Sequence, residues 1–235
     1  MTILNRVLPW VLLLKSVDVA IYGSVQLENQ LLTALFTGGL VVAALVWFRQ
    51  PRAGAALAAL LFVALTAGPL YRNHVVFLAW VTGLTALSSD EREQRLLLTV
   101  HLSVVYAFAT IVKLTPVWLS GEALGSRPVI SLGVPIVVLA WATVIVEGLL
   151  AVAAWRPNRW WFALAVATHV GFILGMGYTV MEFYGLIIFS LVTLAVWAAL
   201  LQARRDAPDE PVLAPLSQPS AAIQARSGGS RRLAP

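Results

Sequence analysis

Two lysines stand apart from the other cations of this chain because both lie within apolar segments. The sequence has 16 lysines and arginines, and the lysines among them are Lys15 and Lys113. Arginine stays protonated in proteins, whereas a lysine removed from water can lose its proton near neutral pH and act as a base. Lys113 is therefore a candidate catalytic base. The alternative is a lysine whose amine reaches the outer membrane interface.

Three histidines and one glutamate also interrupt apolar segments. A charged side chain at mid-membrane costs at least about 2.5–3.5 kcal/mol, so each such residue needs a partner or a function. His169 lies near the middle of its segment and must face the bundle interior, as a satisfied core residue or as a functional group. His74 opens another segment, where hydrogen bonding at a helix end is the alternative to reactivity. His101 and Glu147 fall at similar predicted depths, and we expect them to form a buried structural pair.

Further polar residues fall near the outer ends of the apolar segments. Taken singly, Trp118 is typical of an interface anchor, Glu122 of a solvated loop and Glu182 of a helix cap. Taken together, the outer residues predict an outward-facing polar pocket in a helical bundle, the usual place for a membrane ligand site. We expect no metal site, because the chain has no cysteine and its histidines are separated. The predicted pocket consists of Asn73, His74, Lys113, Trp118, Glu122 and Glu182, with His169 below them.

The elements that position these residues are predicted to be membrane helices. The chain has 235 residues, of which 60% are hydrophobic and 11% charged, whereas a soluble domain carries about 25% charged residues. A spanning helix needs roughly 17–25 mostly apolar residues, and its backbone polar groups must be bonded within the segment. We therefore expect an all-α, polytopic membrane bundle of about eight helices. The predicted spans are 4–26, 31–48, 53–71, 74–89, 96–115, 129–154, 160–177 and 182–203.

The first segment, 4–26, is interrupted by Lys15 and Asp18. These two residues are three positions apart, so they share a helix face and can form an ion pair there. We interpret the segment as a span, and the alternative is a helix lying in the membrane interface.

Paired arginines in alternate connections predict the orientation, because short cytoplasmic loops are enriched in Lys and Arg. With eight spans, both termini are expected in the cytoplasm, and the chain is expected to be a multi-pass protein of a bacterial inner (cytoplasmic) membrane. Residues 1–203 form the predicted membrane domain. Residues 204–235 are rich in Pro, Ser, Gly and Arg and are expected to be a disordered cytoplasmic tail. The arginine pairs are Arg49 and Arg52, Arg92 and Arg95, Arg156 and Arg159, and Arg204 and Arg205.

One stretch of the sequence resembles a family motif. Residues 106–121 read YAFATIVKLTPVWLSG, with Tyr106, Lys113, Trp118 and Gly121 at the characteristic positions. This pattern is similar to the central motif of the vitamin K-dependent gamma-carboxylase and of the broader bacterial horizontally transferred transmembrane (HTTM) domain proteins. Other residues in the same order also resemble that family: Asn73-His74 upstream, and Glu147 and His169 downstream.

The resemblance implies a carbon–carbon lyase that uses a reduced quinone, either vitamin K hydroquinone or menaquinol, with oxygen and carbon dioxide as co-substrates. It implies that Lys113 deprotonates the quinol, that His74 serves the carboxylation step and that the site faces the exterior. His169 and His74 would position oxygen or substrate. The carboxylase has a large domain beyond its membrane core, so we expect peptide recognition to differ here or to be absent. Val112 also stands where the carboxylase has a second lysine.

The alternative to an enzyme is a non-catalytic membrane binding, immunity or peptide-maturation accessory protein whose partner is a small secreted peptide. A transporter is a weaker alternative, because the sequence shows no inverted repeat. The absence of cysteine excludes a quinone-linked thiol reductase. The net charge of +5 forms no basic stripe, so we expect the lipid bilayer, and not nucleic acid, as the partner.

Overall fold

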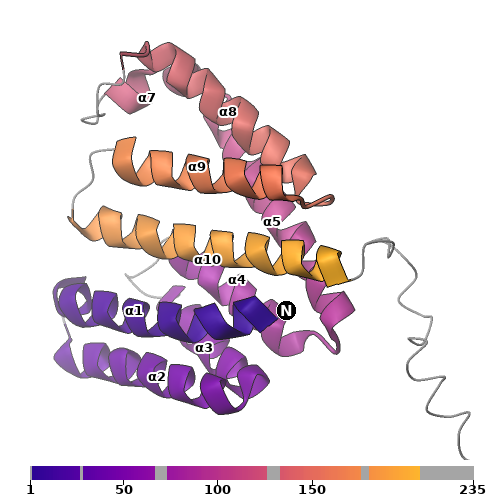
Figure 1. Ribbon diagram of the computed structural model, residues 1–235. Helices are drawn as coiled ribbons and strands as arrows, with labels where there is room; N and C mark the ends of the chain where they lie inside the picture. Colours follow the sequence, from indigo (N-terminus) through magenta and orange to yellow (C-terminus); the bar gives the residue numbers. More distant parts are fainter. Residues whose placement is uncertain (1, 27–28, 67–72, 126–132, 176–179, 207–235) are drawn as a thin grey trace, which may run out of the picture.

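The computed structural model describes residues 2–26, 29–66, 73–125, 133–175 and 180–206, and within them it contains helices and no strand (Figure 1). The predicted all-helical fold is confirmed for this part of the chain, since each of the eight predicted segments forms a long helix. Two short helices, α6 and α7, come after α5. The helices are α1 Thr2–Gln26, α2 Gln30–Arg49, α3 Pro51–Thr66, α4 Asn73–Leu87, α5 Glu91–Lys113, α6 Pro116–Leu119, α7 Glu122–Gly125, α8 Ile136–Ala153, α9 Arg159–Gly175 and α10 Val180–Asp206.

Four of these helices are long and apolar enough to cross a bilayer. They are α2, α5, α8 and the part of α10 from Tyr184 to Asp206. Shorter apolar helices lie at Pro51–Thr66, His74–Leu87 and Arg159–Leu174. The chain is thus a helical protein of membrane character. Residues 204–206 of the predicted tail belong to α10, and residues 207–235 lie outside the described part.

The residues between the predicted spans 74–89 and 96–115 are not only a connection, because α5 already begins at Glu91. The Asp90 side chain caps the helix by accepting a hydrogen bond from the backbone N–H of Glu93, at 2.8 Å. The Glu93 carboxylate accepts hydrogen bonds from the hydroxyl and the backbone N–H of Ser89, at 2.6 Å and 2.5 Å. These two hydrogen bonds lower the pKa of Glu93, and the bond from the Ser89 hydroxyl has the larger effect. Acidic side chains are favoured in a first helical turn, so the charged residues extend the helix instead of interrupting it.

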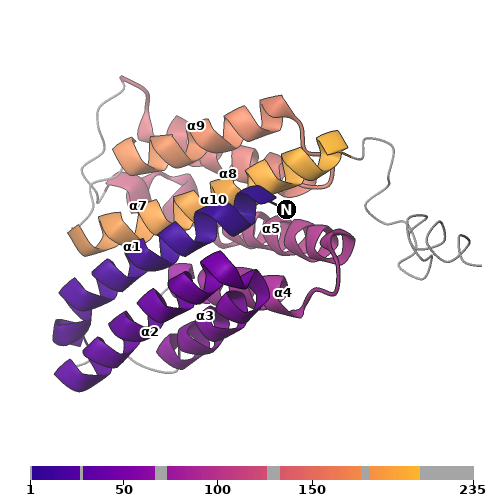
Figure 2. The ribbon, with the colours of Figure 1, turned by 60° about the horizontal axis from the view of Figure 1, so that its bottom comes forward.

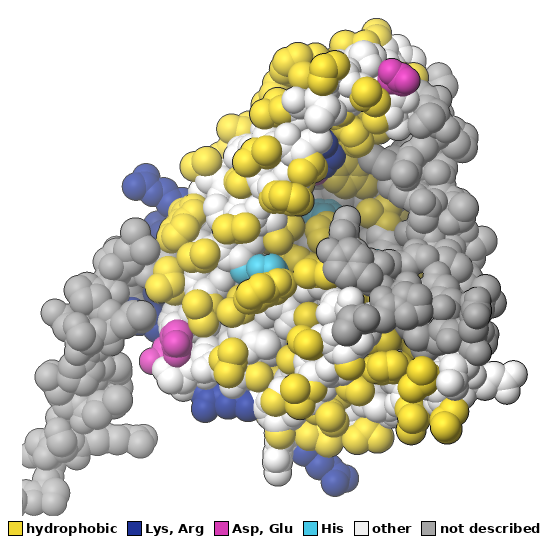
Figure 3. Space-filling model, turned by 180° about the vertical axis from the view of Figure 1, so that it is seen from behind, with side chains coloured by type: hydrophobic (Ala, Val, Ile, Leu, Met, Phe, Trp, Pro, Cys, Tyr) yellow, Lys and Arg dark blue, Asp and Glu magenta, His cyan; other side chains and the backbone are white. Residues whose placement is uncertain are grey.

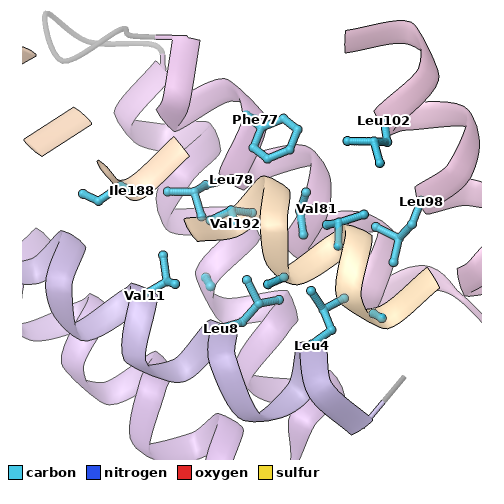
Figure 4. Close-up of a cluster of buried hydrophobic side chains, with 14 of the residues drawn as sticks. Leu4, Leu8, Val11, Phe77, Leu78, Val81, Leu98, Leu102, Ile188 and Val192 are labelled. Carbon is cyan, nitrogen blue, oxygen red and sulfur yellow. The ribbon is translucent and has the colours of Figure 1, made fainter. Parts of the chain in front are cut away.

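Helix α10 is the centre of the bundle and packs against α1, α4, α5 and α9. Both ribbon views place it between α1 and α9, and α1 to α4 succeed one another around one side (Figures 1 and 2). The buried core between these helices is aliphatic and aromatic, and Figure 4 shows α10 entering it with Ile188 and Val192. The same cluster includes Leu8 of α1, Leu78 of α4 and Leu102 of α5.

Helices α5 and α8 form a second packed pair, and α8 is displaced along α5. The Ser103 hydroxyl donates a hydrogen bond to the Ala151 carbonyl at 2.7 Å, and the Trp155 indole N–H donates to the Ser103 oxygen at 3.2 Å. The end of α8 therefore lies beside Ser103 of α5. Ser103 comes eight residues after Arg95, which is about 12 Å farther along the axis of α5. At its other end, α8 continues past the end of α5 and contacts α6 and α7.

The close contact between α6–α7 and α8 depends on Gly121. This residue has φ +82°, and a Cβ placed on it would lie 2.6 Å from the Ile136 Cγ2 atom. Only glycine meets both requirements without strain. Gly121 thereby fixes the segment that carries Trp118 against the first turn of α8.

Candidate functional site

Lys113, at the end of α5, forms an ion pair with Glu147 of α8. The Lys113 Nζ atom lies 2.6 Å from Glu147 Oε1 and 2.5 Å from Glu147 Oε2. The two side chains are 15% and 5% exposed, so both lie largely inside the protein. The amine also lies 5.2 Å from the centroid of the Trp118 ring and 5.9 Å from that of Phe172. Glu147 therefore holds the Lys113 amine largely inside the protein, which favours a functional or structural group over an amine that reaches the membrane interface.

The predicted pair between His101 and Glu147 is wrong, because Glu147 pairs with Lys113. The prediction compared depths counted from the cytoplasmic end of each helix, and this assumes that the two helices end at the same level. Because α8 is displaced along α5, the two helices end at different levels. Glu147 lies six residues before the end of α8, yet it reaches the last residue of α5.

Lys113 lines a mostly apolar pocket between α4, α5 and α10, with a volume of about 690 Å³. A cavity of this size is within the range of sites that hold small organic ligands. The rim carries large exposed side chains, among them Trp80, Val104 and Phe108, which are 57%, 58% and 65% exposed. Figure 3 shows the back of the molecule as a mostly hydrophobic face with histidine atoms visible between the side chains. The polar groups in the lining are those of Lys113, His101 and the Trp80 indole.

His101 faces this pocket from the same helix as Lys113, twelve residues or about 18 Å earlier along α5. Its ring stacks on Phe77, with centroids 5.0 Å apart, and lies 6.2 Å from the Trp80 ring. Its Nε2 atom has no hydrogen-bond partner in the described part of the chain. His101 is thus a wall residue of the pocket, and the sequence reasoning had assigned it only a structural role.

His169 is buried, as predicted, with 1% of its surface exposed. Its Nε2 atom lies 3.1 Å from the Tyr106 hydroxyl and its Nδ1 atom 3.0 Å from the Ser190 hydroxyl. The Trp197 indole N–H also donates to the Tyr106 oxygen, at 3.3 Å. Both ring nitrogens are therefore satisfied, which favours the core-histidine interpretation. Phe189 separates this network from the pocket, since it contacts the His169 ring and lines the cavity.

His74 belongs to another buried cluster, formed with α1. Its Nε2 atom lies 3.0 Å from Lys15 Nζ, and Lys15 pairs with Asp18, which confirms the predicted pair between these two residues. Gly185 of α10 makes room for the imidazole, because an added Cβ would lie 2.8 Å from the His74 Cε1 atom. The described contacts of His74 are to α1 and α10, and none joins it to Lys113. Its helix still reaches the pocket through Phe77, one turn later.

The outer polar pocket predicted from the sequence is thus divided into separate clusters. Trp118 covers the Lys113 amine and is more than an interface anchor. Glu122 is exposed, which favours the solvated interpretation. The side chains of Asn73 and Glu182 lie outside the described residues. Among the residues that the structure describes, no group of three His, Asp or Glu side chains could hold a metal ion.

Comparisons of the chain with protein-family models, curated proteins and solved structures return no match.

Several residues of the site were missed by the sequence reasoning. Phe172 and Phe189 look like ordinary apolar residues, and their contacts with Lys113 and His169 depend on helix packing. Ser190 could have been found, because a hydroxyl in the middle of an apolar span needs a partner. Gly185 could have been suspected for a similar reason, since glycine within a span permits close approach of a neighbouring helix.

Proposed function

We propose that the chain is a multi-pass protein of the bacterial inner membrane with eight spans and both termini in the cytoplasm. The ribbon supports this orientation, because the start of α1, the α2–α3 junction, the start of α5, the α8–α9 junction and the end of α10 lie toward one end of the molecule (Figure 1). Four of these segments carry the paired arginines, and the start of α1 carries Arg6. Concentration of arginine at one end is what the positive-inside rule requires.

We further propose that the pocket beside Lys113 binds a reduced quinone and that the Lys113–Glu147 pair removes a proton from it. The single observation that carries this proposal is that Lys113, whose amine is held by a buried carboxylate, is a lining residue of an apolar pocket of about 690 Å³. The exposed apolar rim gives a lipid-soluble ligand a lateral path from the bilayer. The quinol ring would lie near Lys113, and its prenyl chain would extend along α5 toward His101.

The proton-transfer step uses the pair as a relay. The step begins when the Lys113 ammonium of the ion pair passes a proton to the Glu147 carboxylate, which leaves a neutral amine beside a carboxylic acid. The quinol O–H bond breaks, its proton moves to the Lys113 amine, and the electron pair remains on the quinolate oxygen. Glu147 keeps the proton that it accepted from Lys113, and the Lys113 ammonium then stabilises the quinolate.

The family resemblance suggests the chemistry of the later steps. One quinol and one dioxygen give one quinone epoxide and one water, and the strongly basic intermediate removes a proton from a carbon acid that then adds carbon dioxide. Such a base survives only where water is excluded, and the aromatic and aliphatic walls of the pocket supply that condition. The function proposed is therefore that of a gamma-carboxylase-like quinol-dependent enzyme.

The test is turnover of purified protein with menaquinol and oxygen, with quinone epoxide measured by mass spectrometry. We expect epoxide from the wild type, none from Lys113→Ala and a large loss in Glu147→Gln. The exposed arginine variant Arg156→Gln serves as the matched control and should retain activity. Absence of epoxide from the wild type, under conditions in which a known carboxylase is active, would contradict the enzymatic proposal.

A second candidate is a non-catalytic binding, immunity or peptide-maturation accessory protein that acts with a small secreted peptide. The two-oxygen contact between Glu147 and Lys113 favours it, because such a carboxylate stabilises a permanently charged amine. Lys113→Arg separates the two candidates, since arginine keeps the charge and cannot serve as the base. Ligand binding without epoxide, unchanged in Lys113→Arg, would support the second candidate.

A further inference from the structure

The Lys113 pocket has a second polar position on the same helix, at His101. The two residues are twelve positions apart on α5, or about 18 Å along the helix axis, and both line the pocket. His101 lies in the half of α5 that begins at Glu91, and Lys113 is the last residue of the helix. Two fused aromatic rings are much shorter than the distance between them. A ligand ring beside one of these residues therefore cannot reach the other.

The His101 ring has one nitrogen that a ligand in the pocket can reach. Among the residues that the structure describes, the ring makes stacking contacts and no hydrogen bond. Its Nε2 atom is fully buried against the protein and is closed to a ligand. The residue is half-buried and lines the pocket, and Nδ1 is not one of the buried unpartnered atoms, so Nδ1 is the accessible nitrogen. Because hydrocarbon holds no water to complete its hydrogen bonding, Nδ1 is open to a polar atom of a ligand.

Aromatic packing holds the His101 ring in place. The ring stacks on Phe77 with an interplanar angle of 26° and centroids 5.0 Å apart. Phe77 is itself 3% exposed and contacts Phe189 of α10, with centroids 4.9 Å apart. The imidazole is thus fixed by side chains of α4 and α10. A ligand that bonds to it meets a group that is already oriented, which reduces the entropy lost on binding.

The surroundings of His101 favour an uncharged, flat ligand group. Lys113 is the single residue with a formal charge that lines the pocket, and it lies far from His101 along α5. A charged ligand group at His101 would have no partner of opposite charge, which is unfavourable in an apolar site. The Trp80 ring, 6.2 Å from the His101 ring and 57% exposed, offers a surface on which an aromatic ligand can pack. A carbonyl oxygen on a flat ring meets these conditions.

We propose that an oxidised quinone binds at His101, with its ring against Trp80 and a carbonyl oxygen that accepts a hydrogen bond from the Nδ1–H tautomer of the imidazole. The choice of a quinone among ring ketones rests on the function proposed above. The quinone position at His101 and the quinol position at Lys113 exclude each other, because the prenyl chain of a quinol at Lys113 extends along α5 past His101. The oxidised form therefore competes with the reduced form for one pocket.

Binding of two matched probes to the full chain in lipid nanodiscs tests this inference. Dimethylnaphthoquinone and dimethylnaphthalene share a fused ring, and the quinone alone has carbonyl groups. After subtraction of the uptake by empty nanodiscs, we expect the wild type to bind the quinone about fivefold more tightly, as one net hydrogen bond would allow. His101→Leu should bring the two affinities close together. Val104→Leu, which changes an apolar residue of the same pocket wall, should keep the preference.

The double variant Lys113→Met/Glu147→Leu separates the two ring positions, because it removes the polar pair without leaving one buried charge. We expect it to retain the preference for the quinone. Loss of the preference in the double variant, or its retention in His101→Leu, would overturn the inference. Equal affinities of the wild type for the two probes would also overturn it. The proposed function is judged separately, by epoxide formation from menaquinol.

Nitrogen NMR of the wild type provides a second readout that depends on no binding measurement with a variant. The chain has three histidines, so isotope labelling of histidine gives few ring signals. We expect saturating dimethylnaphthoquinone to shift the ring signals of His101. Those of His74 and His169 should stay unchanged, since these rings bond to other side chains. Unchanged His101 signals at saturation would overturn the inference.

Discussion

The Lys113 amine lies within 2.6 Å of both carboxylate oxygens of Glu147, a residue 34 positions away on another helix. The contact exists because α8 is displaced along α5, so that a residue well inside α8 reaches the last residue of α5. It connects the base proposed for the reaction to a buried proton acceptor. It also makes the pair a structural element of the bundle, with consequences for stability that do not depend on turnover.

Breaking the Lys113–Glu147 pair from one side should destabilise the protein more than removing both partners. Removal of one partner leaves the other charge buried, which costs about 3–5 kcal/mol in comparable pairs, whereas an apolar replacement of both is nearly neutral. We expect Glu147→Leu and Lys113→Met each to lower the free energy of unfolding, and the double variant to recover most of the loss. Unfolding in mixed detergent micelles measures all three. Additive losses in the double variant would show that the two side chains are not coupled.

Tyr106→Phe should destabilise the core by about 1–3 kcal/mol, because it leaves His169 Nε2 and the Trp197 N–H without their hydroxyl partner. Phe108→Leu on the same helix is the control, since Phe108 is largely exposed. The same unfolding measurement applies to both variants. A Tyr106→Phe variant as stable as the wild type would mean that the hydroxyl is not part of a buried network.

Gly185→Ala should destabilise the protein, because the new Cβ would lie 2.8 Å from the His74 ring. Overpacking of this kind costs about 1–3 kcal/mol. Gly171→Ala is a matched control, since an added Cβ there meets nothing within 4 Å. We expect a lower melting temperature for the first variant only. Equal melting temperatures for the two variants would place the His74 ring elsewhere.

Glu93 should make stability depend on pH in the acidic range. Its hydrogen bonds with Ser89 lower its pKa below the ordinary value of 4.5. A carboxyl group whose pKa is lower in the folded state stabilises that state above 4.5 and loses this contribution as the pH falls through the folded-state pKa. We expect Glu93→Gln to remove this part of the acid sensitivity in melting experiments below pH 5. If the bonds with Ser89 contributed nothing, Glu93→Gln would melt with the same pH profile as the wild type.

The helices could be predicted from the sequence because a bilayer imposes length and apolar composition on each segment. The pair between Lys15 and Asp18 could be predicted for a similar reason, since positions three apart on one helix are neighbours. Contacts between different helices could not be predicted from the sequence. The partner of Glu147 depends on how far α8 slides along α5, and that displacement is set by side-chain packing around Ser103, Trp155 and Gly121.

The candidate site could also be predicted only in part. Lys113 could be identified as a candidate from the sequence because it is a lysine within an apolar segment. In the structure it lines a pocket. The predicted grouping of His74 and His169 around Lys113 is not found, because the depth of a residue does not specify which way its helix face points. His74 faces Lys15 on α1, and His169 faces Tyr106 and Ser190. The resulting pocket wall is formed instead by His101 and aromatic residues.

Photo-crosslinking with a menaquinol analogue that carries a diazirine on its prenyl chain tests the central claim most directly. After irradiation of the protein in lipid nanodiscs, mass spectrometry of the digested chain locates the modified residues. The account predicts crosslinks on the pocket-lining residues of α4 and α5, such as Trp80, Val104 and Phe108, with competition by unlabelled menaquinol. Crosslinks that fall outside this pocket, or that are not reduced by the competitor, would contradict it.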